Sequence, residues 1–188
     1  MQEDGIPPDV ITYTSLIKAC ALQGDDGATE IAEGLFLSMQ QRTNHFSSYI
    51  EPTELTYSRL MQANLACGNI ERVWQLFELM RIRSIFPSVY AYRSCMNAAT
   101  QAKDIERGFL VLSQLRPYVV QQRLGLQYKS LPEFYSEMWC DMVDLLQETK
   151  RPGRLSELHD SLIEGLKDEL KVLGFAGMLG STIRIQIQ

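Results

Sequence analysis

The sequence predicts an all-α fold in which helical hairpins stack into a solenoid, and two observations support this fold class. The first is a motif that occurs three times, at residues 8–16 (PDVITYTSL), 52–60 (PTELTYSRL) and 87–95 (PSVYAYRSC). Each copy has a tyrosine five residues after its first proline, and the intervals between the tyrosines are 44 and 35 residues. The second is that apolar residues recur at helical spacing within the copies. Such periods are typical of arrays in which each hairpin buries its apolar face against the next.

The copies align beyond their tyrosines, and this alignment defines the repeat. GNIER at 68–72 and KDIER at 103–107 lie 35 residues apart, as the corresponding tyrosines do. The first copy is longer (44 residues against 35), because three extra residues precede Phe36 and six more lie between Met39 and Pro52. The longer insert is polar and rich in turn-forming residues, so we expect a surface loop there.

Each copy is expected to form two helices joined by a turn. Residues that favour a helix N-cap directly follow each proline of the motif, namely Asp9, Thr53 and Ser88. Gly24 and Gly68 lie where the first helix of a copy should end. The second helix of copy two is predicted over 70–83, where apolar residues form one stripe: Ile70, Val73, Trp74, Phe77 and Met80. We expect Phe77 and Met80 to be buried, and the three motif tyrosines to occupy equivalent sites on successive first helices.

The predicted organisation of the chain follows from these copies. Met1 and Met80 each precede a proline by seven residues, so residues 1–9 resemble the tail of a preceding repeat; the alternative is a short leader that matches by chance. Repeats are expected at 10–53 with the inserted loop, at 54–88 and, in degenerate form, at 89–116. They are followed by a linker at 117–132, a divergent fourth hairpin or capping hairpin at 133–173 and an irregular tail at 174–188. The last residues of this tail, IRIQIQ, alternate with the period of a strand.

The motif V-x-T-Y-x-x-L-I, followed by G, L-F-x-x-M and P-D, resembles the pentatricopeptide repeat, a helical hairpin of about 35 residues. Residues 8–88 carry the pattern well and 89–116 carry it more loosely. The tetratricopeptide repeat has the signature W-x-x-L-G-x-x-Y, which this sequence lacks. The resemblance implies a right-handed superhelical solenoid of about three repeats plus a divergent C-terminal helical pair. It also implies binding of single-stranded RNA at one base per repeat.

The resemblance implies which residues would contact RNA. In the family, the residue after the tyrosine and the last residue of the repeat select the base. These positions correspond to Thr14 with Thr53 in copy one and to Ser58 with Ser88 in copy two. Copy three supplies Arg93 without an identifiable last partner. The apolar positions that flank the bases would be Ile11, Leu55 and Tyr90.

The sequence departs from the family pattern at these positions. The usual base-reading pairs combine Asn or Thr with Asp or Asn, whereas this chain has Thr with Thr and Ser with Ser. The net charge of −5 also argues against strong electrostatic binding to RNA. Against this, the three first helices carry Lys18, Arg59 and Arg93 with Glu54 as their one acid. These cations either form a mildly basic groove for RNA or are ordinary solvated side chains.

Motifs that the sequence lacks argue against membrane, catalytic and metal-binding functions. No apolar run approaches the roughly 18 residues of a membrane span, so no membrane partner is expected. The sequence has no phosphate-binding glycine loop, H-E-x-x-H motif or nucleophile elbow, so we expect neither catalysis nor a cofactor. The four cysteines form no C-x-x-C pair, which favours reduced thiols over a metal site. The family resemblance implies a mitochondrial or chloroplast location. The sequence itself adds no support for this location, since no targeting segment is visible in it.

Three functions remain open from the sequence. The leading one is a single-stranded RNA-binding module of a longer organellar RNA-processing or translation factor, which as this fragment would bind RNA weakly. The second is a protein–protein scaffold, such as a helical subunit associated with an organellar ribosome, and its partners would be other proteins. The third is the RNA-binding arm of a nuclease whose catalytic domain is absent from this sequence. The family pattern favours the first, and the unusual selector pairs favour the second.

Overall fold

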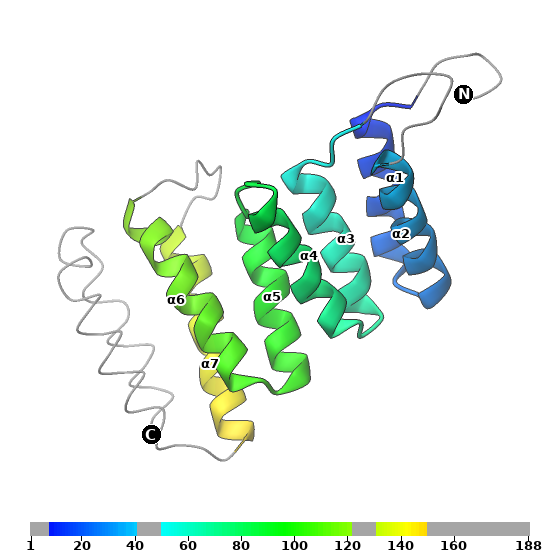
Figure 1. Ribbon diagram of the computed structural model, residues 1–188. Helices are drawn as coiled ribbons and strands as arrows, with labels where there is room; N and C mark the ends of the chain where they lie inside the picture. The colour runs from blue at the N-terminus through cyan, green and yellow to red at the C-terminus, as the bar shows by residue number, and fades with distance from the viewer. Residues whose placement is uncertain (1–7, 41–49, 122–130, 150–188) are drawn as a thin grey trace. The chain divides into compact units, whose positions relative to one another are not determined.

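The computed structural model describes residues 8–40, 50–121 and 131–149, and within these ranges the chain is entirely helical, with no strand (Figure 1). The helices are α1 (Val10–Gln23), α2 (Asp26–Gln40), α3 (Glu54–Ala66), α4 (Ile70–Ile82), α5 (Val89–Ala102), α6 (Ile105–Gln121) and α7 (Leu131–Glu148). The predicted all-α fold is confirmed. The start of the predicted leading tail, the inserted loop, the second helix of the fourth hairpin and the terminal tail lie outside the described residues.

The helix ends form where local sequence directs them. The Asp9 carboxylate accepts a hydrogen bond from the Thr12 amide at 2.8 Å and caps α1. Gly24 and Gly68 end the first helices of two copies at φ values of 69° and 74°, where glycine has no steric cost. The equivalent position of the third copy is Lys103, which adopts the same left-handed conformation at φ 54°. The turn geometry therefore repeats even where the glycine does not.

The chain divides into two compact units. In the first, which spans Met1–Asp104, the two helices of each hairpin, α1 with α2 and α3 with α4, pack against each other. The first helix of each following copy packs against both helices of the hairpin before it: α3 contacts α1 and α2, and α5 contacts α3 and α4 (Figure 1). In the second unit, which spans Ile105–Gln188, α6 packs against α7.

Aromatic pairs repeat between neighbouring hairpins of the first unit. The rings of Phe36 and Tyr57 meet edge to face with centroids 5.2 Å apart, and those of Phe77 and Tyr92 do the same at 5.4 Å. Both tyrosines are buried, while Tyr13 on the first described helix is partly buried. Phe77 and Met80 belong to the core, as the apolar stripe predicts. The shared geometry confirms that these helices are copies of one structural repeat.

One boundary differs from the sequence prediction. A linker is predicted over 117–132, because this stretch contains two prolines and no repeat signature. In the structure α6 continues to Gln121, and α7 begins at Leu131. A proline inside a helix removes one hydrogen bond and can kink the helix without ending it.

Candidate nucleic-acid interface

A row of exposed apolar side chains lies on the first helices of the three copies. Ile11 on α1 is 70% exposed, Leu55 on α3 is 44% exposed and Tyr90 on α5 is 40% exposed. Each lies two positions after the N-cap residue of its helix, so the three are equivalent in the repeat. An apolar side chain held at the same exposed position in every copy offers a regular set of contact points for a partner that extends across the hairpins.

The first predicted selector pair is connected by a chain of hydroxyl groups. The hydroxyl of Thr14 hydrogen-bonds to that of Thr56 at 2.9 Å, and the hydroxyl of Thr56 hydrogen-bonds to that of Thr53 at 3.2 Å. The Thr53 amide also donates to the Thr56 hydroxyl at 3.2 Å. Thr14 is 8% exposed and Thr56 is fully buried. The structure therefore brings Thr14 and Thr53 together, but their hydroxyls are engaged within the protein.

The second predicted selector pair makes a direct contact. The hydroxyls of Ser58 and Ser88 lie 3.4 Å apart, although the two residues are 30 positions apart in the sequence. Ser58 donates to the carboxylate of Glu54, one helical turn earlier, at 2.5 Å, and it is 1% exposed. The hydroxyl of Ser88 accepts from the Ala91 amide at 3.4 Å and so caps α5. Ser58 is therefore closed to solvent, whereas Ser88 and Glu54 remain partly accessible.

The three predicted cations lie on three different helices. The guanidinium of Arg59 on α3 lies over the ring of Tyr90 on α5, 6.0 Å from the ring centroid, and donates to Gln62 at 2.9 Å. Lys18 is exposed on α1, and Arg93 is half-buried on α5. The contact between Arg59 and Tyr90 joins one predicted cation to one predicted base-flanking residue.

Two residues of this interface were missed by the sequence prediction, Thr56 and Glu54. Thr56 bridges the first selector pair, and Glu54 binds a member of the second. A signal existed for each. Thr56 stands three residues after the N-cap Thr53, which is the spacing of a capping box, and Glu54 stands four residues before Ser58 on one helix face.

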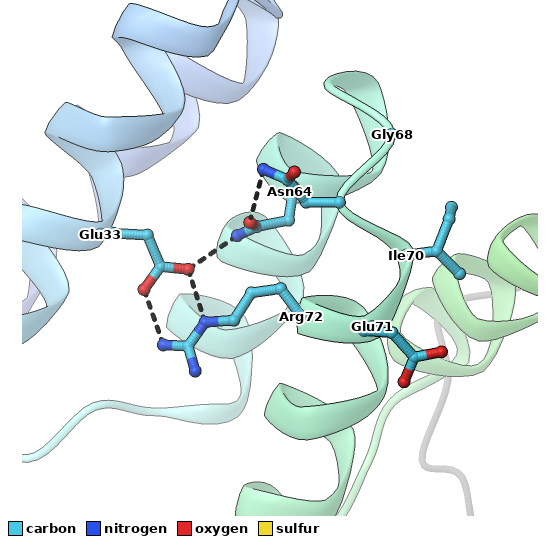
Figure 2. Close-up of a pocket in the computed structure, with 7 residues that line it drawn as sticks. Glu33, Asn64, Gly68, Ile70, Glu71 and Arg72 are labelled. Atoms are coloured by element: carbon cyan, nitrogen blue, oxygen red, sulfur yellow. Dashed lines mark hydrogen bonds and ion pairs between the residues drawn. The ribbon is translucent and has the colours of Figure 1, made fainter.

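An open pocket of about 490 Å³ lies at the junction of the first two hairpins, and Figure 2 shows the residues that line it. Glu33 of α2 accepts two hydrogen bonds from Arg72 of α4, at 2.9 and 2.7 Å, and one from the Asn64 amide of α3 at 2.8 Å. This hydrogen bonding raises the pKa of Arg72 above its ordinary value. The Glu33 carboxylate thus joins three helices, and its acceptor sites are used inside the protein. We call Glu33, Asn64 and Arg72 the clasp, because their hydrogen bonds connect the first two hairpins.

In the part of the chain that the structure describes, no group of three or more His, Cys, Asp or Glu side chains is arranged to hold a metal ion. Among the described helices, none combines the length and the apolar character needed to cross a membrane.

Comparison with known proteins gives two family matches. A family model described as "Pentatricopeptide repeat domain" matches residues 1–64, and one described as "PPR repeat" matches residues 55–85. Together these matches cover residues 1–85. This range includes Thr14, Thr53 and Ser58 of the two selector pairs, but not Ser88, the N-cap of α5.

Curated relatives carry related names. The chain is 28% identical over 156 residues to the mitochondrial 15S rRNA processing factor of Yarrowia lipolytica, covering 79% of this chain and 19% of that protein. It is 23% identical over 124 residues to a mitochondrial pentatricopeptide repeat-containing protein of Arabidopsis thaliana, covering 66% of this chain and 28% of the relative. A chloroplastic pentatricopeptide repeat-containing protein of the same plant is 30% identical over 92 residues, covering 49% of this chain and 8% of the relative. The chain therefore spans less than a third of the length of these relatives.

Proposed function

Because the chain belongs to the pentatricopeptide-repeat family, we propose that it is a single-stranded RNA-binding part of an organellar RNA-processing or translation factor. The observation that carries the proposal is the row of exposed Ile11, Leu55 and Tyr90 at equivalent positions on α1, α3 and α5. The names of the relatives support it, since one processes a mitochondrial ribosomal RNA and others are mitochondrial or chloroplastic.

The proposed mode of binding follows from the side chains of this face. The flat ring of Tyr90 and the apolar side chains of Ile11 and Leu55 would contact the faces of unpaired bases, which any base can provide. Lys18 and Arg59 would contribute attraction to the phosphates. Thr14 and Ser58 are buried and hydrogen-bonded within the protein, so they contribute little direct contact with base edges. We therefore expect weak binding with limited sequence preference.

The test is a titration of the chain with a labelled single-stranded RNA at low and moderate salt. Binding should weaken as salt rises, and each phosphate contact should contribute about 0.7 to the slope of log K against log salt concentration. The triple variant Lys18→Glu, Arg59→Glu, Arg93→Glu should lose most of the binding. The matched control is Arg81→Glu, which reverses an exposed cation on α4, a second helix, and should bind as the unaltered chain does.

One observation favours a second function, a protein–protein scaffold. Thr14 and Ser58, one member of each selector pair, are buried and hydrogen-bonded within the protein, which would suit a face that no longer reads bases. Absence of RNA binding at low salt, or binding that is indifferent to the three charges, would favour the scaffold over the RNA-binding function.

A further inference from the structure

A carboxylate lies next to the second selector pair, Ser58 and Ser88, although neither selector residue is acidic. Glu54 is the first residue of α3, is partly accessible, and accepts a hydrogen bond of 2.5 Å from the buried Ser58 hydroxyl. Such a bond restricts where the carboxylate can point. A carboxylate offers about four acceptor sites on its two oxygens, so one hydroxyl leaves most of them free for a ligand.

The contacts of α3 with α5 place this carboxylate beside the proposed base-binding positions. Glu54 and Ser58 form one stripe of α3, and Leu55 and Arg59 form the adjacent stripe, since residues four apart share a helix face. The first stripe reaches α5 at Ser88, and the second reaches it at Tyr90. A base held against Leu55 and Tyr90 would therefore have its edge next to the stripe that carries Glu54.

We infer that Glu54 is a specificity-determining residue that selects guanine at this position of a bound RNA, with Ser58 as its positioning residue. The inference rests on the proposed function. On its Watson–Crick edge, guanine presents two adjacent donors, the N1–H and an N2–H, which match the two oxygens of one carboxylate. Adenine and cytosine present a single amino group next to an acceptor nitrogen, and uracil presents a single N3–H between two carbonyls. Against those bases the carboxylate would face acceptor atoms, which is unfavourable.

The experiment compares four short oligouridine strands that differ at one central residue: guanosine, inosine, adenosine or uridine. Inosine keeps the N1–H of guanosine and lacks the N2 amino group, so it removes one of the two proposed hydrogen bonds. The unaltered chain should bind the guanosine strand about tenfold more tightly than the uridine strand, the discrimination of one good bidentate contact. The inosine strand should lie between them.

Two variants test separately the carboxylate of Glu54 and the Ser58 hydroxyl that positions it. In Glu54→Gln the preference for guanosine should fall to less than about twofold. Binding of the plain uridine strand should be unchanged or tighter, because a negative charge near the phosphates is removed. Ser58→Ala keeps the charge and should lower the preference for guanosine by releasing the carboxylate. The matched control is Glu30→Gln, which removes an exposed carboxylate from α2 and should keep the full preference.

The outcomes distinguish this inference from the proposed function. Equal affinities of the unaltered chain for the guanosine and inosine strands would overturn the role of Glu54 and leave RNA binding intact. A preference that survives in Glu54→Gln would do the same. Failure to bind any of the four strands would overturn both.

Discussion

In the first two copies, the phenylalanine of the second helix and the tyrosine of the next first helix form a contact that joins neighbouring hairpins. Phe36 meets Tyr57, and Phe77 meets Tyr92, with edge-to-face geometry in both cases. This arrangement places the electropositive edge of one ring against the face of the other, and it adds to the free energy gained from burial. The pair therefore explains why a tyrosine recurs in the motif and a phenylalanine recurs in two of the copies.

Replacement of Phe77 by alanine should lower the free energy of unfolding by about 3–5 kcal/mol, because a buried ring is lost and a cavity remains. Phe77 is 3% exposed and loses its contact with Tyr92 in this variant. Chemical denaturation followed by circular dichroism measures the change. Phe86→Ala is the control, since Phe86 is 49% exposed and should cost much less. An unaltered midpoint in Phe77→Ala would show that the ring does not belong to the core.

At the scale of helices, packing between hairpins is supplemented by the clasp of Glu33, Asn64 and Arg72. Its hydrogen bonds connect residues that are 31 and 39 positions apart in the sequence. The guanidinium of Arg72 forms a two-point contact with the carboxylate of Glu33, and this geometry holds both side chains in one orientation. The clasp thereby fixes α4 of the second hairpin to α2 of the first (Figure 2).

A double-mutant cycle with Glu33→Ala and Arg72→Ala should yield a coupling free energy of about 1 kcal/mol, which decreases as salt is added. The value is modest because the two side chains are 23% and 34% exposed, and water screens their attraction. The pair Glu78 and Arg81 on α4 is the control. Their side chains are 55% and 50% exposed, so their coupling should be about 0.3 kcal/mol. Equal couplings for the two pairs would contradict the role of the clasp.

At the scale of the whole molecule, charge is unevenly distributed among the helices of the first unit, although α4 carries two acids and two bases. The first helices α1, α3 and α5 carry Lys18, Arg59 and Arg93 with one acid, Glu54, whereas α2 carries three acids and no base. The net charge of −5 therefore does not describe the face that carries Ile11, Leu55 and Tyr90. This distribution is compatible with weak binding of a polyanion to one face of an acidic protein.

The thiol of Cys95 should report the opening of the first unit. It is fully buried on α5, and burial, together with the nearby charge of Glu78, raises its pKa well above the ordinary value. In native protein it should react with iodoacetamide about 5,000-fold more slowly than Cys20, because reaction requires an opening that costs about 5 kcal/mol. Mass spectrometry of pulse-labelled samples measures both sites. As denaturant is added, labelling of Cys95 should rise together with the loss of helical signal. Rapid labelling of Cys95 without denaturant would show that α5 opens locally.

The sequence by itself determined the features that depend on local pattern. The repeat interval, the caps at Asp9 and Ser88 and the left-handed turns at Gly24 and Gly68 all follow from residues within a few positions of one another. The burial of Phe77 and Met80 follows from one helical stripe. The shift of Phe36 by three residues in the longer first copy, relative to Phe77 in the second, was also visible in the sequence, because the motif can be aligned on both sides of the insert.

The tertiary structure decided which polar groups remain available. Thr14 meets Thr56 across 42 residues, and Ser58 meets Ser88 across 30, so their hydroxyls are engaged although their sequence positions predict base contact. A hydrogen bond depends on distances of a few tenths of an ångström between stacked helices, and residue spacing does not contain this information. The same limit explains why the clasp at Glu33, whose partners are 31 and 39 residues away, was not predicted. The sequence specifies which side chains share a face, and the packing of one hairpin on the next determines which of them bind each other and which can bind a ligand.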